Sequence, residues 1–426
     1  MANARQQRKA LIASLVGNSI EWYDYFLYGT ATALVFNKLF FPSFDPVVGL
    51  MLSYLTFALP FFIRPLGGIV FAHIGDRIGR KKTLVATLML MGVSTVLIGL
   101  LPSYESIGVL APILLVTLRV IQGMGIGGEW GGALLIAVEH SDEKKRALYG
   151  SVPQMGVPIG LLLGTFAMSL TTFLTTDEQF LSWGWRVPFL ISAVLVGVGF
   201  WIRNGVEESE AFQKVKESGE VAKVPLVETL KHHWKEVLLA TGMKVVETAP
   251  FYIFSTFIIS YATKFVNMDR TVVLNSITIS TLVCVLLIPV MGRLADRVGR
   301  RPLYLWGTVA MILYTFPYFM LVNTGSNGLL ILANVIGLGI IWTPITAVLG
   351  TLYSEIFSTK VRYTGVTLGY QLGAALAGGT APLIATALLS RYDNSYVPVA
   401  IYLMLASSLS LLAILLTKET KGRMIH

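Results

Sequence analysis

The stretch G-D-R-I-G-R-K at residues 75–81 recurs as A-D-R-V-G-R-R at residues 295–301, after an offset of 220 residues. Each copy follows a long apolar run. A second set of charged residues repeats at an offset of 216 and consists of Glu139 with Arg146 and Glu355 with Arg362. Two marks at nearly the same offset indicate that one structural unit has been duplicated. Parallel repeats of this kind are a hallmark of membrane transporters.

The composition indicates a membrane protein. Of the 426 residues, 54% are hydrophobic and only 13% are charged, whereas about 25% are charged in soluble proteins. Most of the apolar runs can supply the roughly 20 residues that cross a bilayer as a helix, and they are too long and uniform for the strands of a barrel. There are twelve such runs, at residues 11–36, 47–72, 84–101, 108–138, 150–174, 187–201, 237–262, 271–294, 303–322, 328–353, 363–389 and 396–417.

We therefore predict an all-α polytopic membrane protein whose twelve transmembrane helices form two pseudo-symmetric six-helix bundles. The N-terminal bundle covers residues 1–203 and the C-terminal bundle covers residues 234–426. The polar stretch 204–233 between them is predicted to be a cytoplasmic linker that carries an amphipathic helix.

Lysine and arginine residues determine the predicted orientation. With twelve crossings and a cytoplasmic N-terminus, most of them fall on the cytoplasmic side, as the positive-inside rule requires. We predict that both termini are cytoplasmic and that the basic N-terminal segment precedes a retained first span. The net charge of +9 then reflects topology and does not indicate nucleic-acid binding.

Several motifs resemble those of a known family. The two D-R-x-G-R-[KR] loops and the R-V-I-Q-G-M-G-I-G stretch at residues 119–127 are similar to signature motifs of the major facilitator superfamily. The first loop has Ala72 where the family has the glycine that the second copy keeps as Gly292. Further motifs resemble the metabolite:proton symporter family, most closely its shikimate carriers and also its 2-oxoglutarate and proline/betaine carriers. They are E-W-Y-D-Y at residues 21–25, R-P-L-G-G at 64–68, G-G-E-W-G-G at 127–132 and F-L-S-W-G-W-R-V-P-F at 180–189.

Ionisable residues inside the spans are candidates for function, because a charge at a helix centre costs about 2.5–3.5 kcal/mol on insertion scales. The resemblance implies that an acid in span one and an arginine in span four couple transport to protons. We carry this role to Asp24 and Arg119, with Glu21 as a secondary candidate. Exchange of the guanidinium between carboxylate and substrate would couple proton binding to substrate binding. The alternative is a static ion pair that only holds the bundle together.

The substrate candidates come from helix-face spacing and from the family's practice of lining its cavity with spans one, four, seven and ten. Residues three or four apart share a helix face, which groups Tyr28 with Asp24 and Gln122 with Arg119. A packing or gating role is the alternative for Arg64, a structural role for Glu129, and lipid or helix packing for Tyr252, Trp342, Tyr370 and Gln371. The candidates are Arg64, Tyr28, Gln122, Glu129, Lys244, Glu247, Tyr252, Trp342, Tyr370 and Gln371.

The repeated charges predict a gate at the cytoplasmic ends of the spans. A carboxylate there is stabilised by a neighbouring helix N-terminus, and arginine residues can pair with acids across the bundle. Ordinary surface ion pairs of little worth are the alternative. The gating candidates are Asp76, Arg77, Arg80, Glu139, Arg146, Asp296, Arg297, Arg300, Glu355 and Arg362.

The predicted function is proton-coupled uptake of a small organic acid such as shikimate by a bacterial cytoplasmic-membrane transporter that functions as a monomer. The chain has no P-loop, nucleophile elbow or H-E-x-x-H motif, so we predict no ATP-driven pump, no enzyme, no cofactor and no metal site. The lone Cys284 is predicted to be a buried apolar side chain. A proline/betaine-type zwitterion carrier, a non-transporting receptor and sodium coupling remain alternatives.

Overall fold

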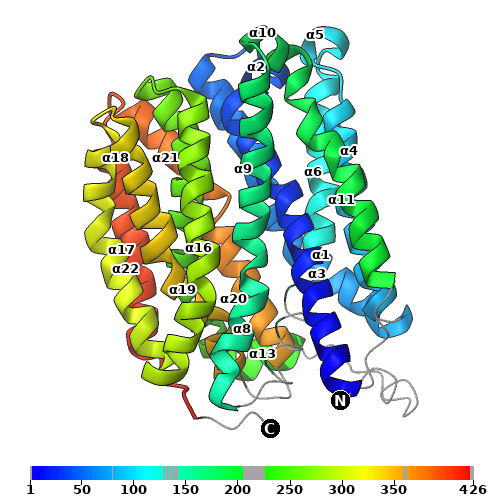
Figure 1. Cartoon of the computed structure of the whole chain (residues 1–426), viewed down its shortest axis with the longest axis vertical. Helices are drawn as coiled ribbons and strands as arrows, with labels where there is room; N and C mark the ends of the chain where they lie inside the picture. The colour runs from blue at the N-terminus through cyan, green and yellow to red at the C-terminus, as the bar shows by residue number, and fades with distance from the viewer. Residues whose placement is uncertain are drawn as a thin grey trace.

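The computed structural model describes residues 2–78, 80–127, 130, 134, 138, 143–204, 226–357 and 362–422. These residues form helices and connecting turns, with no strand among them. Figure 1 shows long helices that run side by side, with the two chain ends at one end of the molecule. We call this the terminal end, and the other the opposite end.

The N-terminal half contributes six spans. Proline residues lie inside several of these helices, as Pro60 and Pro65 do in the second span. The spans are α1 (Ala2–Ala31) with η1 (Thr32–Phe36) and α2 (Asn37–Phe40); α3 (Pro46–Ile78); α4 (Arg80–Leu100); α6 (Leu110–Ile126); α8 (Arg146–Gln154) with α9 (Gly156–Leu174); and α11 (Arg186–Asn204). Short helices α5 (Tyr104–Ile107) and α10 (Asp177–Gln179) lie at the opposite end.

The C-terminal half contributes six more spans. They are α14 (Trp234–Tyr252) with η4 (Ile253–Phe257), α15 (Ile258–Ser260) and η5 (Tyr261–Phe265); α16 (Arg270–Val298); α17 (Arg300–Val322); α18 (Asn327–Asn334) with η6 (Val335–Ile341) and α19 (Trp342–Ile356); α20 (Arg362–Ala377) with α21 (Thr380–Arg391); and α22 (Val397–Leu416). The short helix α13 (Leu226–His232) precedes them, while residues 205–225 of the predicted linker lie outside the described residues.

Within the described residues, eight helices are long and apolar enough to cross a membrane, and a bent pair over Asp177–Ile202 makes a ninth. Val85–Leu100 and Leu110–Ile126 are shorter apolar helices. The first span carries the ionisable residues Glu21 and Asp24. The eight helices, the bent pair, the two shorter helices and the first span together account for the twelve spans.

The outer surface of the molecule is apolar. Phe173, Trp201 and Leu416 are 75%, 77% and 75% exposed. In water such a surface would be an aggregation liability, whereas a lipid bilayer covers it at no cost. Polar side chains such as Arg64, Arg119 and Asp24 are instead buried between the helices.

The two halves meet through α9 and α16, which pack along much of their length (Figure 1). Polar contacts occur in this interface: Ser169 Oγ donates to Asn275 Oδ1 at 2.7 Å, and Thr278 Oγ1 donates to Thr165 Oγ1 at 3.3 Å. A second contact joins α3 to α20 and α21. The two halves are therefore joined by two sets of helix contacts, that of α9 with α16 and that of α3 with α20 and α21. A narrow cavity lies between these two sets of contacts.

Candidate functional site

The central cavity is lined by residues of both halves. It consists of two narrow adjoining parts that share Trp22, Arg64 and Tyr370. The part nearer the terminal end is also lined by Asn18, Glu21, Ile126, Trp130 and Gln371. The other part is also lined by Phe61, Val157, Lys244, Glu247, Thr248, Phe251, Tyr252, Trp342 and Ala374. An arginine, a lysine, two acids and several aromatic rings therefore face one another across the halves.

Arg64 of α3 is the cation shared by both parts of the cavity. Its side chain is buried at 1% exposure. The guanidinium carbon lies 4.3 Å from the ring centroid of Phe61, 4.7 Å from that of Tyr25 and 5.1 Å from that of Trp22. Nε and Nη2 have no hydrogen-bond partner among the described residues. Buried donors without partners are costly, so this guanidinium is ready to bind an acceptor.

Lys244 and Glu247 of α14 form a buried ion pair on the other side of the cavity. The Lys244 Nζ lies 3.7 Å from the ring centroid of Tyr370. Thr346 donates a hydrogen bond to the Glu247 carboxylate at 3.2 Å, and the Thr248 hydroxyl lies 3.0 Å from the same carboxylate while also donating to the Lys244 carbonyl at 2.8 Å. This carboxylate is therefore held by the Thr346 hydroxyl as well as by the lysine.

Asp24 of α1 does not line this cavity. Its side chain is fully buried where α1 packs against α4 and α11. Ser192 of α11 donates a hydrogen bond to Oδ1, while Oδ2 has no hydrogen-bond partner among the described residues. The Thr95 hydroxyl lies beside the same carboxyl group but donates to the Met91 carbonyl at 3.0 Å. No cationic side chain of the described residues forms an ion pair with Asp24.

The predicted ion pair of Asp24 with Arg119 is therefore not formed here. Arg119 donates to the carbonyls of Thr56 and Phe57 of α3, both at 3.1 Å, and to Gln122 Oε1 at 2.5 Å. The Thr56 carbonyl is available because Pro60, four residues later, has no N–H to offer it. Gln122 Nε2 in turn donates to Thr95 Oγ1 at 2.9 Å. Gln122 and Thr95 thus connect Arg119 to the neighbourhood of Asp24.

Eight of the predicted residues line the cavity: Glu21, Arg64, Lys244, Glu247, Tyr252, Trp342, Tyr370 and Gln371. Tyr28 and Gln122, predicted to bind substrate, are not among its lining residues. Tyr28 instead packs its ring 3.7 Å from the Arg119 guanidinium carbon and shares a hydrogen bond of 2.6 Å with Thr56. Glu129 lies outside the described residues.

Sequence reasoning missed several aromatic lining residues. Trp22 and Trp130 stand next to the singled-out acids Glu21 and Glu129, and Phe251 follows Pro250. Aromatic residues are abundant in membrane helices, so an aromatic residue alone does not indicate a cavity. The one available signal was that Trp22 and Trp130 stand next to acids within the family motifs. Within the described residues no group of three or more His, Cys, Asp or Glu side chains is placed to hold a metal ion, and Cys284 is buried.

At the terminal end, Glu355 of α19 joins the two halves. Its carboxylate accepts from Arg300 Nη2 at 3.2 Å and from Arg146 Nη1 at 3.4 Å. Asp296 accepts from the backbone N–H groups of Ala147 and Leu148 at 2.9 and 3.1 Å, at the start of α8. This matches the predicted contact between a loop carboxylate and a helix N-terminus.

The rest of the predicted gate is less complete. Arg297 is exposed, and its carbonyl accepts a hydrogen bond from Lys421 Nζ at 2.6 Å. Its side chain lies outside the network because it faces solvent. The side chains of Asp76, Arg77, Arg80 and Arg362, and all of Glu139, lie outside the described residues.

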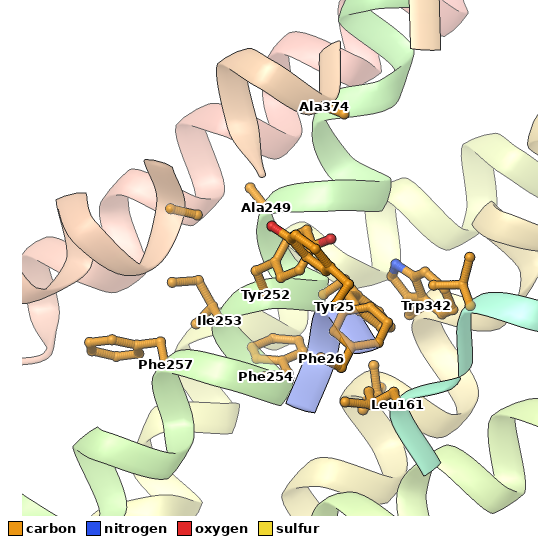
Figure 2. Packing of buried hydrophobic residues seen from close by; sticks show 14 of the residues in the cluster. Tyr25, Phe26, Leu161, Ala249, Tyr252, Ile253, Phe254, Phe257, Trp342 and Ala374 are labelled. Carbon is orange, nitrogen blue, oxygen red and sulfur yellow. The ribbon is translucent and has the colours of Figure 1, made fainter. Parts of the chain in front are cut away.

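The opposite end is closed mainly by aromatic contacts between α1 and the seventh span. Phe26 lies 5.5 Å from Phe251 and 5.9 Å from Tyr252, centroid to centroid, and Figure 2 shows Tyr25 and Phe26 against Tyr252. Tyr54 Oη and Ser260 Oγ share a hydrogen bond of 2.8 Å across the halves. The cavity is therefore covered at both ends.

Comparison with known proteins places this architecture in a family. The family model of the Major Facilitator Superfamily matches residues 20–378 and 245–424. The chain is 42% identical over 417 residues to the shikimate transporter of Escherichia coli, covering 97% of this chain and 95% of that protein. It is 36% identical over 428 residues to the glycine betaine/proline/ectoine/pipecolic acid transporter of Dickeya dadantii, covering 98% and 84%.

The fold is also similar to that of a solved structure, a proton:xylose symporter bound to 6-bromo-6-deoxy-D-glucose. The TM-score is 0.76 at 17% identity, covering 99% of this chain and 98% of that one. These matches confirm the predicted fold class and the predicted resemblance. The chain belongs to the Major Facilitator Superfamily and is a metabolite transporter, not an enzyme.

Proposed function

We propose that the chain takes up a small organic anion across the bacterial cytoplasmic membrane, coupled to protons, by alternating access. The observation that carries this proposal is the buried side chain of Arg64, which lines the cavity and whose Nε and Nη2 have no hydrogen-bond partner among the described residues. A planar guanidinium binds a carboxylate through two parallel hydrogen bonds. The similarity to a shikimate transporter agrees with a carboxylate substrate.

The cavity offers a second polar contact to such a substrate. Gln371 is buried at 3% exposure, and its Oε1 has no hydrogen-bond partner among the described residues. A substrate hydroxyl or amide group can donate to this oxygen while its carboxylate binds Arg64. The rings of Trp22 and Phe61, which line the cavity, supply apolar walls that hold a carbon skeleton.

Asp24 is the proposed proton site. In the closed arrangement, its carboxyl group accepts one hydrogen bond, from Ser192, and faces no cation among the described residues. An isolated buried carboxylate is much costlier than a neutral carboxyl group, so we place the proton on Asp24 in this state. Arg119 lies two hydrogen-bonded side chains away, through Gln122 and Thr95. Its movement toward Asp24 when the bundle opens would favour proton release.

The terminal end is the proposed cytoplasmic side. The basic residues Arg146, Arg300 and Lys421 lie there, in agreement with the positive-inside rule. The paired charges of Glu355 would then form the inner gate, and the aromatic contacts of α1 with the seventh span would form the outer gate. Rocking of the two halves opens one end while the other stays closed.

Proteoliposomes test the coupling. An inward proton gradient should drive accumulation of substrate by the unaltered protein, while Asp24→Asn should abolish accumulation and retain substrate exchange. Asp45→Asn is the matched control, because the exposed Asp45 caps α3 through its side-chain oxygen, and asparagine caps equally well. Normal accumulation by Asp24→Asn would show that the coupling site lies elsewhere. Varying pH and Na⁺ separately identifies the driving ion.

A zwitterion carrier is the second candidate, because a relative named for glycine betaine and proline is 36% identical to this chain. Separate binding measurements decide between the candidates. Shikimate, 2-oxoglutarate, glycine betaine and proline are each added at the same concentration in a thermal-shift experiment, since a ligand that binds more tightly raises the unfolding midpoint further. Stabilisation by betaine alone would favour the second candidate. Binding without flux under any gradient would indicate a receptor.

A further inference from the structure

Lys244 occupies an unusual place in the cavity. It is 2% exposed and lies near the middle of α14, inside the membrane span, where a lysine is costly unless it is paired or has a function. Its ammonium group is held by Glu247, one turn later on the same helix, and lies 3.7 Å from the centroid of Tyr370 on α20. A carboxylate and an aromatic face together can bind a cation. Here both are already in contact with Lys244, a cation of the chain itself.

This cation site does not depend on Lys244 for its shape. The hydroxyl group of Thr346 holds the Glu247 carboxylate, and Trp342 Nε1 donates to the Glu247 carbonyl at 2.5 Å. The Tyr370 ring is stacked on Trp130 with centroids 3.8 Å apart. A fixed carboxylate beside aromatic faces is the arrangement that recognises quaternary and other substituted ammonium groups.

Two other rings that line the cavity, those of Trp22 and Phe61, lie next to a second cation of the chain. The Arg64 guanidinium covers the rings of Trp22, Tyr25 and Phe61. Both cations line the same cavity, and like charges repel strongly in surroundings of low dielectric constant. A carboxylate that enters meets the unpaired Nε and Nη2 of Arg64, whereas an ammonium group finds the position between Glu247 and Tyr370 taken by Lys244.

We propose that Lys244 is a tethered cation that fills an ammonium subsite formed by Glu247 and Tyr370, and so makes the cavity select anions over zwitterions. This inference rests on the proposed anion-binding function, with Arg64 as the carboxylate partner. A zwitterion such as glycine betaine would place its carboxylate at Arg64 but would then have to displace Lys244. Removing the lysine charge opens the subsite and leaves the carboxylate site intact.

The test replaces Lys244 with a residue of similar length and no charge. Purified Lys244→Met is titrated with glycine betaine, and its thermal unfolding midpoint and proton-driven uptake are measured. We expect betaine to stabilise this variant at a concentration at least about tenfold below that needed for the unaltered protein, an effect within the range of a desolvated cation–π contact. Lys244→Arg keeps a cation over Tyr370 and should gain nothing.

Two further variants make the result specific. Lys244→Met combined with Glu247→Gln removes the carboxylate of the subsite and should lose the gain while remaining folded. Lys235→Met is the matched control, because Lys235 is an exposed lysine on the same helix whose Nζ lies 5.7 Å from the Trp234 ring centroid. It should behave like the unaltered protein.

The outcomes separate this inference from the proposed function. If folded Lys244→Met and Lys244→Arg respond equally to betaine, or if the unaltered protein already binds betaine as tightly as Lys244→Met does, the tethered-cation proposal is wrong. Failure of every tested organic acid to bind the unaltered protein would instead contradict the proposed anion function. The betaine titration of Lys244→Met remains measurable in that case.

Discussion

Arg64 shows how much depends on the geometry of one side chain. Lysine would keep the charge but would not present two parallel N–H groups to a carboxylate. We expect Arg64→Lys to weaken the apparent affinity for the organic acid about 10-fold to 100-fold, because hydrogen bonds between charged groups contribute about 1.5–3 kcal/mol. Substrate binding by equilibrium dialysis gives the value.

Arg391→Lys provides the comparison for this measurement, since Arg391 is exposed at the end of α21 and does not line the cavity. It should bind substrate as the unaltered protein does. Equal affinities for Arg64→Lys and the unaltered protein would remove Arg64 from the binding site.

Glycine at residue 67 permits close helix packing. A Cβ added there would collide with the Met124 backbone of α6, whereas a Cβ at Gly197 of α11 would meet nothing within 4 Å. We expect Gly67→Ala to destabilise the protein by about 1–3 kcal/mol, as overpacking does, and Gly197→Ala to be neutral or stabilising. Thermal unfolding in detergent compares the two, and a similar unfolding midpoint for both would show that α3 and α6 can separate freely.

At the residue scale the sequence predicted which charges are buried but not which of them meet. Asp24 and Arg119 are both fully buried, as their positions within apolar runs required. Their separation depends on Pro60, which frees a carbonyl that Arg119 binds, and on Gln122, which lies between them. Such a choice among several possible partners depends on tertiary geometry, which spacing along one helix does not contain.

At the scale of elements, the segment after α22 completes the N-terminus of another helix. The Glu419 carboxylate accepts from the backbone N–H groups of Arg300 and Arg301 at 3.1 and 3.0 Å, where α17 begins. Thr420 Oγ1 donates to Glu355 at 2.5 Å. The C-terminal segment thus supports the same carboxylate that joins the two halves.

Removing this support should weaken the terminal end. We expect Glu419→Ala to destabilise the start of α17 by about 0.3–1 kcal/mol, the usual contribution of a charge at a helix end. Hydrogen exchange of the amides of Arg300 and Arg301 should accelerate. The exposed neighbour Lys418, changed to alanine, should leave these amides unaltered, and slow exchange in Glu419→Ala would exclude the capping role.

The apolar runs predicted the spans well, because hydropathy directly reflects the cost of exposing backbone and side chains to lipid. They did not predict the π-helical turns, such as Ile253–Phe257 after Pro250. These turns reflect how each helix repacks its backbone against its neighbours, which hydropathy does not record. The domain boundaries at residues 203 and 234 stay predictions.

For the whole molecule, the two closed ends rest on different chemistry. Ion pairs around Glu355 close the terminal end, and a hydrogen bond of Tyr54 with Ser260 supports the opposite end. We expect Glu355→Gln to favour opening of the terminal end and Tyr54→Phe to favour opening of the opposite end, each by about 1–3 kcal/mol, the cost of leaving buried partners unsatisfied.

Spin-label distances measure these shifts. One label pair replaces the exposed residues Lys145 and Val298 at the terminal end, and another replaces Glu178 and Tyr392 at the opposite end. The lone Cys284 is buried, so background labelling is low. Glu355→Gln should lengthen the first distance and Tyr54→Phe the second. The same response to both substitutions would contradict alternating closure of the two ends.

Asp24 lies on α1 but outside the cavity lining, and this separation has a consequence for how the substrate of the transporter can change. Residues that surround Asp24, such as Ser192 and Thr95, are not the residues that line the cavity. Mutations that reshape the cavity can therefore alter which molecule is carried without replacing the side chains that surround the proposed proton site.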